Sequence, residues 1–135
     1  MTIRISVDGE VVRVVWNGKP DDDSLRAYFA EIEACSRRLS RYAIVYDFRD
    51  AELPSASRRR LLAAMTARTA PEVRDRCVGI AFVISSATIR AALVAVLWIQ
   101  PMKVEHVVVE TVEEAERWVD ARLVGHDRRG SGSLG

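Results

Sequence analysis

The stretch that decides the fold is IRISVDGEVVRVVW, which runs from Ile3 to Trp16. Apolar and polar residues alternate at its start, the pair Asp8-Gly9 interrupts them, and a second apolar run begins at Val11. An Asp-Gly pair between two such runs is the strongest short-range signal for a β-hairpin. The sequence therefore predicts that two antiparallel strands come first in the fold.

Beyond the hairpin, helical and extended patterns alternate along the chain. Apolar residues at helical spacing predict four helices, and short apolar runs predict three further strands. The pair Ala70-Pro71 is expected to end the second helix, because proline disfavours helical backbone at the residue before it. We expect helices over about 21–39, 55–69, 86–99 and 111–123, and strands over about 42–48, 77–84 and 104–109.

A hairpin that leads into repeated strand and helix units is typical of an α/β fold. The order β-β-α-β-α-β-α-β-α predicts a single mixed five-stranded sheet, parallel over its later strands, with right-handed crossovers. A chain of 135 residues has the length of one domain. We expect an α/β domain over 1–124 and a disordered tail or linker over 125–135, where the Gly- and Ser-rich sequence lacks periodicity.

Charge and hydropathy exclude several classes of protein. Lys and Arg total 20 against 19 Asp and Glu, so the net charge of +1 provides no field that would gather nucleic acid. No run reaches the roughly 18 apolar residues that span a bilayer, and the first residues lack the apolar core of a signal peptide. We therefore expect a cytoplasmic protein with no transmembrane segment and no nucleic-acid partner.

The sequence contains none of the common enzyme or metal-site motifs. No GxSxG, HExxH, Walker or GxGxxG pattern is present, and Cys35 and Cys77 form no CxxC motif. His106 follows Glu105 in an expected strand, where adjacent side chains point to opposite faces. We therefore expect no catalytic residue, cofactor or metal, and hence no enzyme. An alternative is an enzyme that uses Asp47 and nearby arginines on a phosphorylated small molecule.

The helix expected over 86–99 lacks a polar face. Every residue from Ala91 to Ile99 is apolar, and a helix that is apolar on all sides must be buried on all sides. This stretch is about 14 Å long, too short to cross a bilayer. We expect a second copy of the chain to cover it; an apolar ligand cavity and internal burial are the alternatives. The residues of this interface or pocket are Arg90, Leu93, Val94, Leu97 and Trp98.

The start of the second expected helix carries an unfavourable charge. Arg58, Arg59 and Arg60 fall in or near its first turn, where the positive end of the helix dipole disfavours each cation by about 0.3–1 kcal/mol. With the hydroxyls of Ser55 and Ser57 and free backbone N–H groups, these guanidinium groups could hold a phosphate or an acidic partner. The sequence thus indicates a candidate anion-binding site.

Acidic residues near the end of the third expected strand allow a simpler interpretation. Asp50 and Glu52 lie between the strand and the helix, so the arginines could pair with them or with solvent. Asp47 lies at the carboxyl end of the strand, where open α/β sheets commonly bind ligands. The alternative role for Asp47 is to hold a loop or to cap a helix.

Three stretches of the chain share a loose pattern of apolar residues and turns with a known family. They are DGEVVRVVWNGKP over 8–20, YAIVYDFRDAELPSAS over 42–57, and ALVAVLWIQPMKVEHVVVETVEEAERWVDARL over 92–123. In these stretches the chain resembles the STAS-like superfamily, named for sulfate transporters and anti-sigma-factor antagonists, and within it the divergent SpoIIAA-like members. The resemblance implies a SpoIIAA-like fold and a regulatory role.

In the antagonists of this family, a phosphorylatable serine begins the helix after the third strand, inside an Asp-Ser-Ser/Thr-Gly sequence. The resemblance places Ser55 and Ser57 there, although Pro54 precedes them and Arg58 follows them where the family has Asp and Gly. The resemblance to divergent members of the family implies an alternative function, in which the chain is a carrier or sensor of an apolar, lipid-like ligand.

We expect a non-enzymatic regulatory protein-interaction module with a regulatory protein partner, homodimeric through helix 86–99. Its signalling surface comprises Asp47, Arg49, Asp50, Ser55, Ser57, Arg58 and Arg59.

Overall fold

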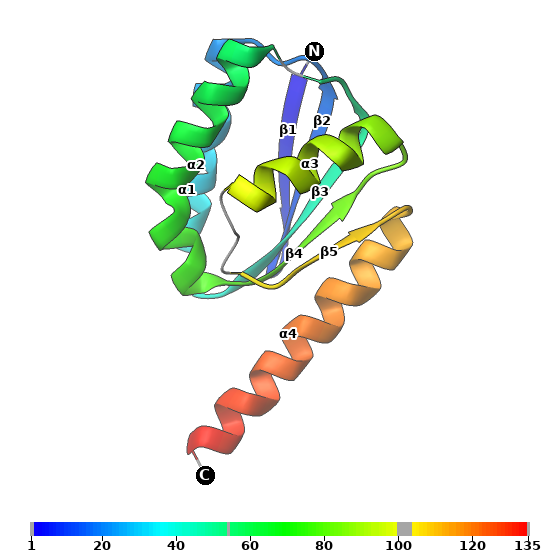
Figure 1. Cartoon of the computed structure of the whole chain (residues 1–135). Coiled ribbons are helices and arrows are strands. Elements are labelled where there is room, and N and C mark those ends of the chain that lie inside the picture. Colours follow the sequence, from blue (N-terminus) through cyan, green and yellow to red (C-terminus); the bar gives the residue numbers. More distant parts are fainter. Residues whose placement is uncertain (1, 54, 100–103, 135) are drawn as a thin grey trace.

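A sheet of five strands organises the structure, a computed structural model that describes residues 2–53, 55–99 and 104–134 (Figure 1). The strands follow one another across the sheet in chain order, with β1 antiparallel to β2 and each later pair parallel. This arrangement confirms the predicted mixed sheet and the predicted order of elements. The strands are β1 (Thr2–Asp8), β2 (Val11–Gly18), β3 (Tyr42–Ala51), β4 (Cys77–Val83) and β5 (His106–Val109).

The first two strands form the predicted hairpin. Asp8 pairs with Val11 across a two-residue connection, and Gly9 has a φ of 61°. Glycine adopts this backbone region without strain, and the first central position of a type II′ hairpin turn requires it. The hairpin places β1 at one edge of the sheet, and β5 forms the other edge.

Four helices connect and cover the strands within the described residues. They are α1 (Asp22–Arg38), α2 (Ala56–Arg76), α3 (Ala87–Ile99) and α4 (Val112–Leu134). Each helix starts at a polar side chain that accepts a hydrogen bond from a backbone N–H in the first turn, because those N–H groups have no partner inside the helix. The capping side chains are those of Asp21, Ser55, Ser86 and Thr111.

The second helix is longer than the sequence predicts, so the expected end at Ala70-Pro71 is wrong. α2 continues through Pro71 to Arg76. A proline inside a helix removes one hydrogen bond and costs about 3 kcal/mol, but Pro71 is exposed, so water can reach the backbone there. Tertiary contacts hold the last turn, because the Arg76 guanidinium donates to the Arg37 carbonyl at 3.2 Å and to the Ser36 carbonyl at the end of α1.

The helices cover the two faces of the sheet unequally. Side chains of α1, α2 and α3 pack on one face, together with the large residues Tyr42, Ile44 and Phe82. On the opposite face, α4 packs against β3 and β4, as Figure 1 shows for its first half. Alternation along each strand separates the two sets, because successive side chains point to opposite faces.

The α4 side of the sheet is built from small residues that let the helix come close. Ala43 and Ala81 are fully buried beneath Ala115 and Val119 of α4. At Gly79 of β4, a Cβ atom would lie 2.8 Å from the Trp118 ring, closer than real Cβ atoms come. Gly79 is therefore required by the close approach of a side chain from α4, since its backbone φ is not in the region that only glycine favours.

The fourth helix continues beyond the domain boundary expected from the sequence. The structure assigns residues 125–134 to α4, where the sequence predicts a disordered tail, and Figure 1 shows this part of the helix extending away from the sheet. Helices propagate more easily than they nucleate, so a well-packed first half can extend. Leu123 is the last buried residue described in α4. The boundary near residue 124 stays a prediction.

Along the described segments, no helix combines the length and apolar content that crossing a membrane requires. The apolar helix α3 has 13 residues, well below the roughly 20 residues that span a bilayer.

Candidate functional site

The start of α2 presents two hydroxyl groups to solvent. Ser55 caps the helix by accepting a hydrogen bond from the Arg58 backbone N–H at 3.4 Å, and its Oγ lies 3.2 Å from the Ser57 Oγ. Both serines are exposed. The first turn contains no acidic residue, so nothing in it neutralises the partial positive charge at this end of the helix.

The Arg58 side chain joins the starts of α1 and α2. Its Nε lies 3.4 Å from Asp22 Oδ1, a residue 36 positions earlier in the chain. Sequence reasoning offered Asp50, Glu52 or solvent as partners of the arginines and missed this contact. The only sequence signal was the run of three aspartates at 21–23.

Asp21 lies next to Asp22 in the chain and caps the start of α1. Hydrogen bonds from Ser24, chiefly from its backbone N–H, lower the pKa of the Asp21 carboxyl, and the charge of Arg58 adds a smaller effect in the same direction. The two adjacent helix starts therefore place exposed hydroxyls, one guanidinium and two carboxylates within one surface region, which contains Asp21, Asp22, Ser55, Ser57 and Arg58.

Asp47 and Arg49 form a second, separate unit of the predicted signalling surface. The Arg49 Nε and Nη2 donate to Asp47 Oδ1 and Oδ2 at 2.9 and 2.7 Å, and the Arg49 backbone N–H donates to Oδ1 at 3.1 Å. These hydrogen bonds outweigh the effect of burial and lower the pKa of Asp47. The Asp47 carboxylate thus accepts hydrogen bonds from Arg49, which favours a role in holding the local structure over a role in ligand binding.

The strand geometry explains why the signalling surface is divided. β3 extends to Ala51, so Asp47, Arg49 and Asp50 lie in the strand and not in a loop after it. Asp47 lies two residues from Val45, which belongs to the cluster under α4, whereas α2 packs on the opposite face. The structure therefore groups Ser55, Ser57 and Arg58, and holds Asp47 and Arg49 on the other side of the sheet.

Helix α3 has an exposed apolar side in the single chain. Ile89 and Leu93 pack against the core cluster, while Ala91, Val94 and Ala95 are exposed, Val94 by 45%. The Leu97 and Trp98 side chains, which the sequence also assigned to this surface, lie outside the described part of the structure. The Arg90 guanidinium lies 3.7 Å from Glu110 of the same chain. An apolar strip thus faces outward beside this ion pair.

The same core cluster contains an aromatic group that sequence reasoning missed. The Tyr46 and Phe82 rings stack with their centroids 5.4 Å apart, and Phe48 lies 5.5 Å from Tyr46. The Tyr28 and Tyr46 hydroxyls are 2.5 Å apart, and burial raises the pKa of both phenols. Among the described atoms, the buried Trp16 Nε1 has no hydrogen-bond partner.

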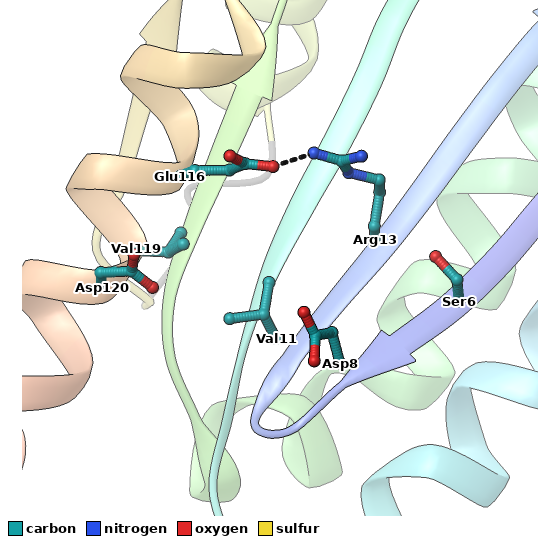
Figure 2. A pocket seen from close by; sticks show the side chains of 7 residues that line it. All are labelled: Ser6, Asp8, Val11, Arg13, Glu116, Val119 and Asp120. Atoms are coloured by element: carbon teal, nitrogen blue, oxygen red, sulfur yellow. Dashed lines mark hydrogen bonds and ion pairs between the residues drawn. The ribbon is translucent and has the colours of Figure 1, made fainter.

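A polar groove lies on the part of the α4 side that α4 leaves open. Figure 2 shows Glu116 of α4 reaching Arg13 of β2, with Asp8 farther along the hairpin beside Val11. The groove has a volume of about 390 Å³ and is lined by Ser6, Asp8, Val11, Arg13, Glu116, Val119 and Asp120. The part of the chain that the structure describes contains no group of His, Cys, Asp and Glu residues able to hold a metal ion.

No family model and no curated protein matches the chain, but several solved structures have a similar fold. An uncharacterised DUF3478-family protein with a SpoIIAA-like fold from Shewanella loihica PV-4 has a TM-score of 0.65 at 14% identity, over 87% of this chain and 92% of that chain.

Two other similar structures have names that state a role for those proteins. An anti-sigma factor antagonist from Mycobacterium paratuberculosis has a TM-score of 0.54 at 19% identity, over 88% of this chain and 93% of its own. The phosphorylated form of the Bacillus cell fate determinant SpoIIAA has a TM-score of 0.56 at 19% identity, over 87% and 99%. The chain therefore has a SpoIIAA-like fold, as the sequence predicted.

Proposed function

We propose that the chain is a regulatory protein-interaction module that acts in the cytoplasm, binds a protein partner through the part of the signalling surface at the start of α2 and catalyses no reaction. The observation that carries this proposal is the start of α2, where exposed Ser55 and Ser57 lie beside Arg58 without an acidic residue in the first turn. The similarity to an anti-sigma factor antagonist supports the same role.

We further propose that Ser55 is the position of a phosphorylation switch, with Ser57 as the second candidate. A phosphate at a helix start is stabilised by free N–H groups, by the helix dipole and by a nearby guanidinium. Phosphorylated Ser55 would compete with Asp22 for the Arg58 guanidinium, since the Arg58 backbone N–H already donates to Ser55 and the guanidinium contacts Asp22 at the start of α1. The switch would therefore change the charge and the side-chain arrangement of the surface in one step.

The switch is tested by incubating the purified chain with bacterial lysate and ATP and mapping phosphorylated residues by mass spectrometry. We expect label on Ser55 or Ser57, reduced by Ser55→Ala or Ser57→Ala respectively. Ser86 is a matched control, because it is an exposed cap at the start of α3 with no arginine cluster beside it. Absence of label from both Ser55 and Ser57, or equal label on Ser86, contradicts the switch.

Partner binding has its own test. The tagged chain is used to capture proteins from lysate, and Ser55→Asp is compared with Ser86→Asp. We expect the captured regulatory protein to be lost, or exchanged for another, only with the Ser55 variant. If both variants capture the same proteins as the unmodified chain, the start of α2 is not the binding surface.

We also propose that the exposed apolar side of α3 forms a contact between two copies of the chain. Ala91, Val94 and Ala95 supply the surface, and an apolar patch of this kind is costly to leave in water. Light scattering should show a mass that Val94→Asp lowers. Val124→Asp is the matched control, because Val124 is 50% exposed on α4. An unmodified chain with the monomer mass of 15.1 kDa contradicts this contact.

An apolar ligand is the second candidate function, and one observation favours it. The Trp16 Nε1–H is buried without a partner among described atoms, inside an aromatic cluster that α3 partly covers. A lipid-like molecule with one acceptor oxygen would satisfy this donor. Native mass spectrometry of the purified chain tests it: a monomer that carries a co-purified lipid supports the carrier, and a ligand-free dimer supports the module.

A further inference from the structure

Strand β1 has an open outer edge. Among the described strands it pairs only with β2, and it lies at the end of the sheet. Ser6, Val7 and Asp8 are exposed along it, and Val7 is one of the three large apolar residues that the described surface exposes most, at 39%. An open strand edge offers unpaired N–H and C=O groups to another strand.

The hairpin register determines which backbone groups face outward. The two-residue turn makes Asp8 and Val11 the closing pair, which exchanges hydrogen bonds across the hairpin. Hydrogen-bonded and non-hydrogen-bonded pairs then alternate, so Ser6 and Arg4 also point their backbone groups toward β2. The N–H and C=O groups of Ile5 and Val7 therefore point to the open side.

The side chains of β1 are complementary to those of a second β1 that runs antiparallel to it. If Ser6 lies opposite Ser6 of the second copy, then Arg4 lies opposite Asp8 of that copy, and Asp8 opposite its Arg4. Opposite charges in this position attract, and like charges repel. In the same register Ile5 of one copy lies opposite Val7 of the other. The N–H and C=O groups that these residues point outward can therefore form hydrogen bonds between the two copies.

We propose that two copies of the chain join through their β1 strands in this register, forming one continuous ten-stranded sheet with a twofold axis at Ser6. A twofold contact uses the same patch on both copies, and the alternation of Arg4, Ser6 and Asp8 is symmetric in charge about its centre. Val7 becomes covered by Ile5 of the second copy. Ser6 and Asp8 also line the polar groove, so the groove of each copy reaches the axis.

This contact is separate from the surface proposed for α3. Ile89 and Leu93 of α3 belong to the core cluster on one face of the sheet, whereas the β1 contact uses the sheet edge. The test is therefore carried out in the Val94→Asp background, where the α3 contact is removed. Failure of the β1 contact then leaves the proposed function standing, and failure of the α3 contact leaves the β1 contact standing.

Cysteine substitution tests the register directly. Ser6 faces its own counterpart, at a Cβ spacing close to that of a disulfide, so Ser6→Cys should form a cross-linked dimer under mild oxidation. Arg4→Cys and Asp8→Cys should each form little cross-linked dimer alone and should cross-link when the two variants are mixed. The native Cys35 and Cys77 are buried, so both can stay in the Val94→Asp background. Without a Ser6→Cys dimer, or with Arg4→Cys linking mainly to itself, the register is wrong.

Charge reversal tests the energetics of the same contact. Sedimentation at a series of concentrations should show a dimer in the Val94→Asp background. Adding Asp8→Arg should weaken dimerisation about tenfold or more, because Arg4 then faces a like charge twice. Adding Arg4→Asp to that variant should restore the affinity to within about threefold. A monomer at every concentration, or no restoration by the second substitution, overturns the proposal.

Discussion

Helices α2 and α4 begin in opposite ways. At the start of α4, Thr111 accepts a hydrogen bond from the Glu114 backbone N–H at 3.2 Å and donates to the Glu114 carboxylate at 3.1 Å. The first turn also contains Glu113, so its charge suits the helix dipole. At the start of α2, Ser55 accepts over 3.4 Å and arginines replace the glutamates. The start of α4 is therefore stabilised by its cap and by its acidic residues, whereas the start of α2 has a longer capping hydrogen bond and no acidic residue in its first turn.

The two regions also differ in their packing and ion pairs. Ala115 and Val119 of α4 are fully buried, whereas Thr69 is the only buried side chain among those described in α2. On the α4 side of the sheet, Asp47 is held by Arg49 with its side chain 9% exposed. At the start of α2, the Asp22 carboxylate that contacts an arginine is 54% exposed. The α2 start can therefore change its contacts without disturbing the core, as a regulated surface must.

The close packing of α4 predicts the largest effect. Gly79→Ala should lower the free energy of unfolding by about 2 kcal/mol, because the added methyl group overlaps the Trp118 ring. Gly125→Ala is the control, since no atom lies within 4 Å of that position, and it should leave stability unchanged or raise it by about 0.5 kcal/mol. Urea denaturation measures both. Equal stability of the two variants would show that Trp118 is loosely held.

The difference between the two ion pairs predicts the next effect. Asp47→Asn should lower the free energy of unfolding by about 1–2 kcal/mol, because a charged acceptor of three hydrogen bonds is lost. Asp22→Asn should cost at most about 0.5 kcal/mol, as is usual for an exposed pair. Chemical denaturation of both variants at neutral pH makes the comparison, and similar losses would contradict it.

The pH dependence of the same pair follows from the lowered pKa of Asp47. A carboxyl whose folded pKa is below its unfolded value contributes stability above about pH 4 and loses that contribution as the pH falls through the folded pKa. Unfolding curves between neutral and acidic pH should therefore converge for the unmodified chain and Asp47→Asn in strong acid. A constant difference between the two curves would show that the charge of Asp47 is not the source of its stabilisation.

The two capping residues predict a smaller difference. Thr111→Ala should lower the free energy of unfolding by about 1 kcal/mol, because it removes both hydrogen bonds with Glu114. Ser55→Ala should lower it by about 0.3–0.5 kcal/mol, since one long, exposed hydrogen bond is lost. Thermal unfolding of the two variants resolves the order. The reverse order would mean that the α2 start contributes more to stability than its geometry indicates.

The charges in the first turns predict the smallest effects, and these have opposite signs. Arg60→Glu should raise the free energy of unfolding by about 0.3–0.5 kcal/mol, and Glu113→Arg should lower it by a similar amount. Both differences should shrink at about 1 M salt, where charges are screened over a few ångströms. If Arg60→Glu instead lowers the free energy of unfolding at low salt, Arg60 stabilises the fold. The charges at the starts of α2 and α4 would then differ less in their effect on stability than we expect.

Much of the fold could be predicted, because its signals are local. The Asp8-Gly9 turn, the caps at Asp21 and Thr111 and the apolar stripe of α4 that includes Val119 are each recognised within a few residues. The end of α2 could not be predicted in this way, since the contacts of Arg76 with the end of α1 help to carry the helix past Pro71.

The candidate site could be predicted only in part. Ser55 was predicted because its hydroxyl lies beside an arginine run at the expected helix start and because the family resemblance placed it there. The contact between Arg58 and Asp22 joins two helix starts 36 residues apart, and Arg13 meets Glu116 across 103 residues. Charge alone does not select among the many carboxylates of the chain, so these pairs were not predictable.

The sequence by itself determined the order of strands and helices, the hairpin and the helix caps, because backbone preferences and apolar periodicity act over a few neighbouring residues. Only the tertiary structure decided that the signalling surface divides between two sides of the sheet, that α3 exposes Val94, and that β1 remains an open edge. These features depend on how distant segments pack together, and packing energies are shared by many residues at once.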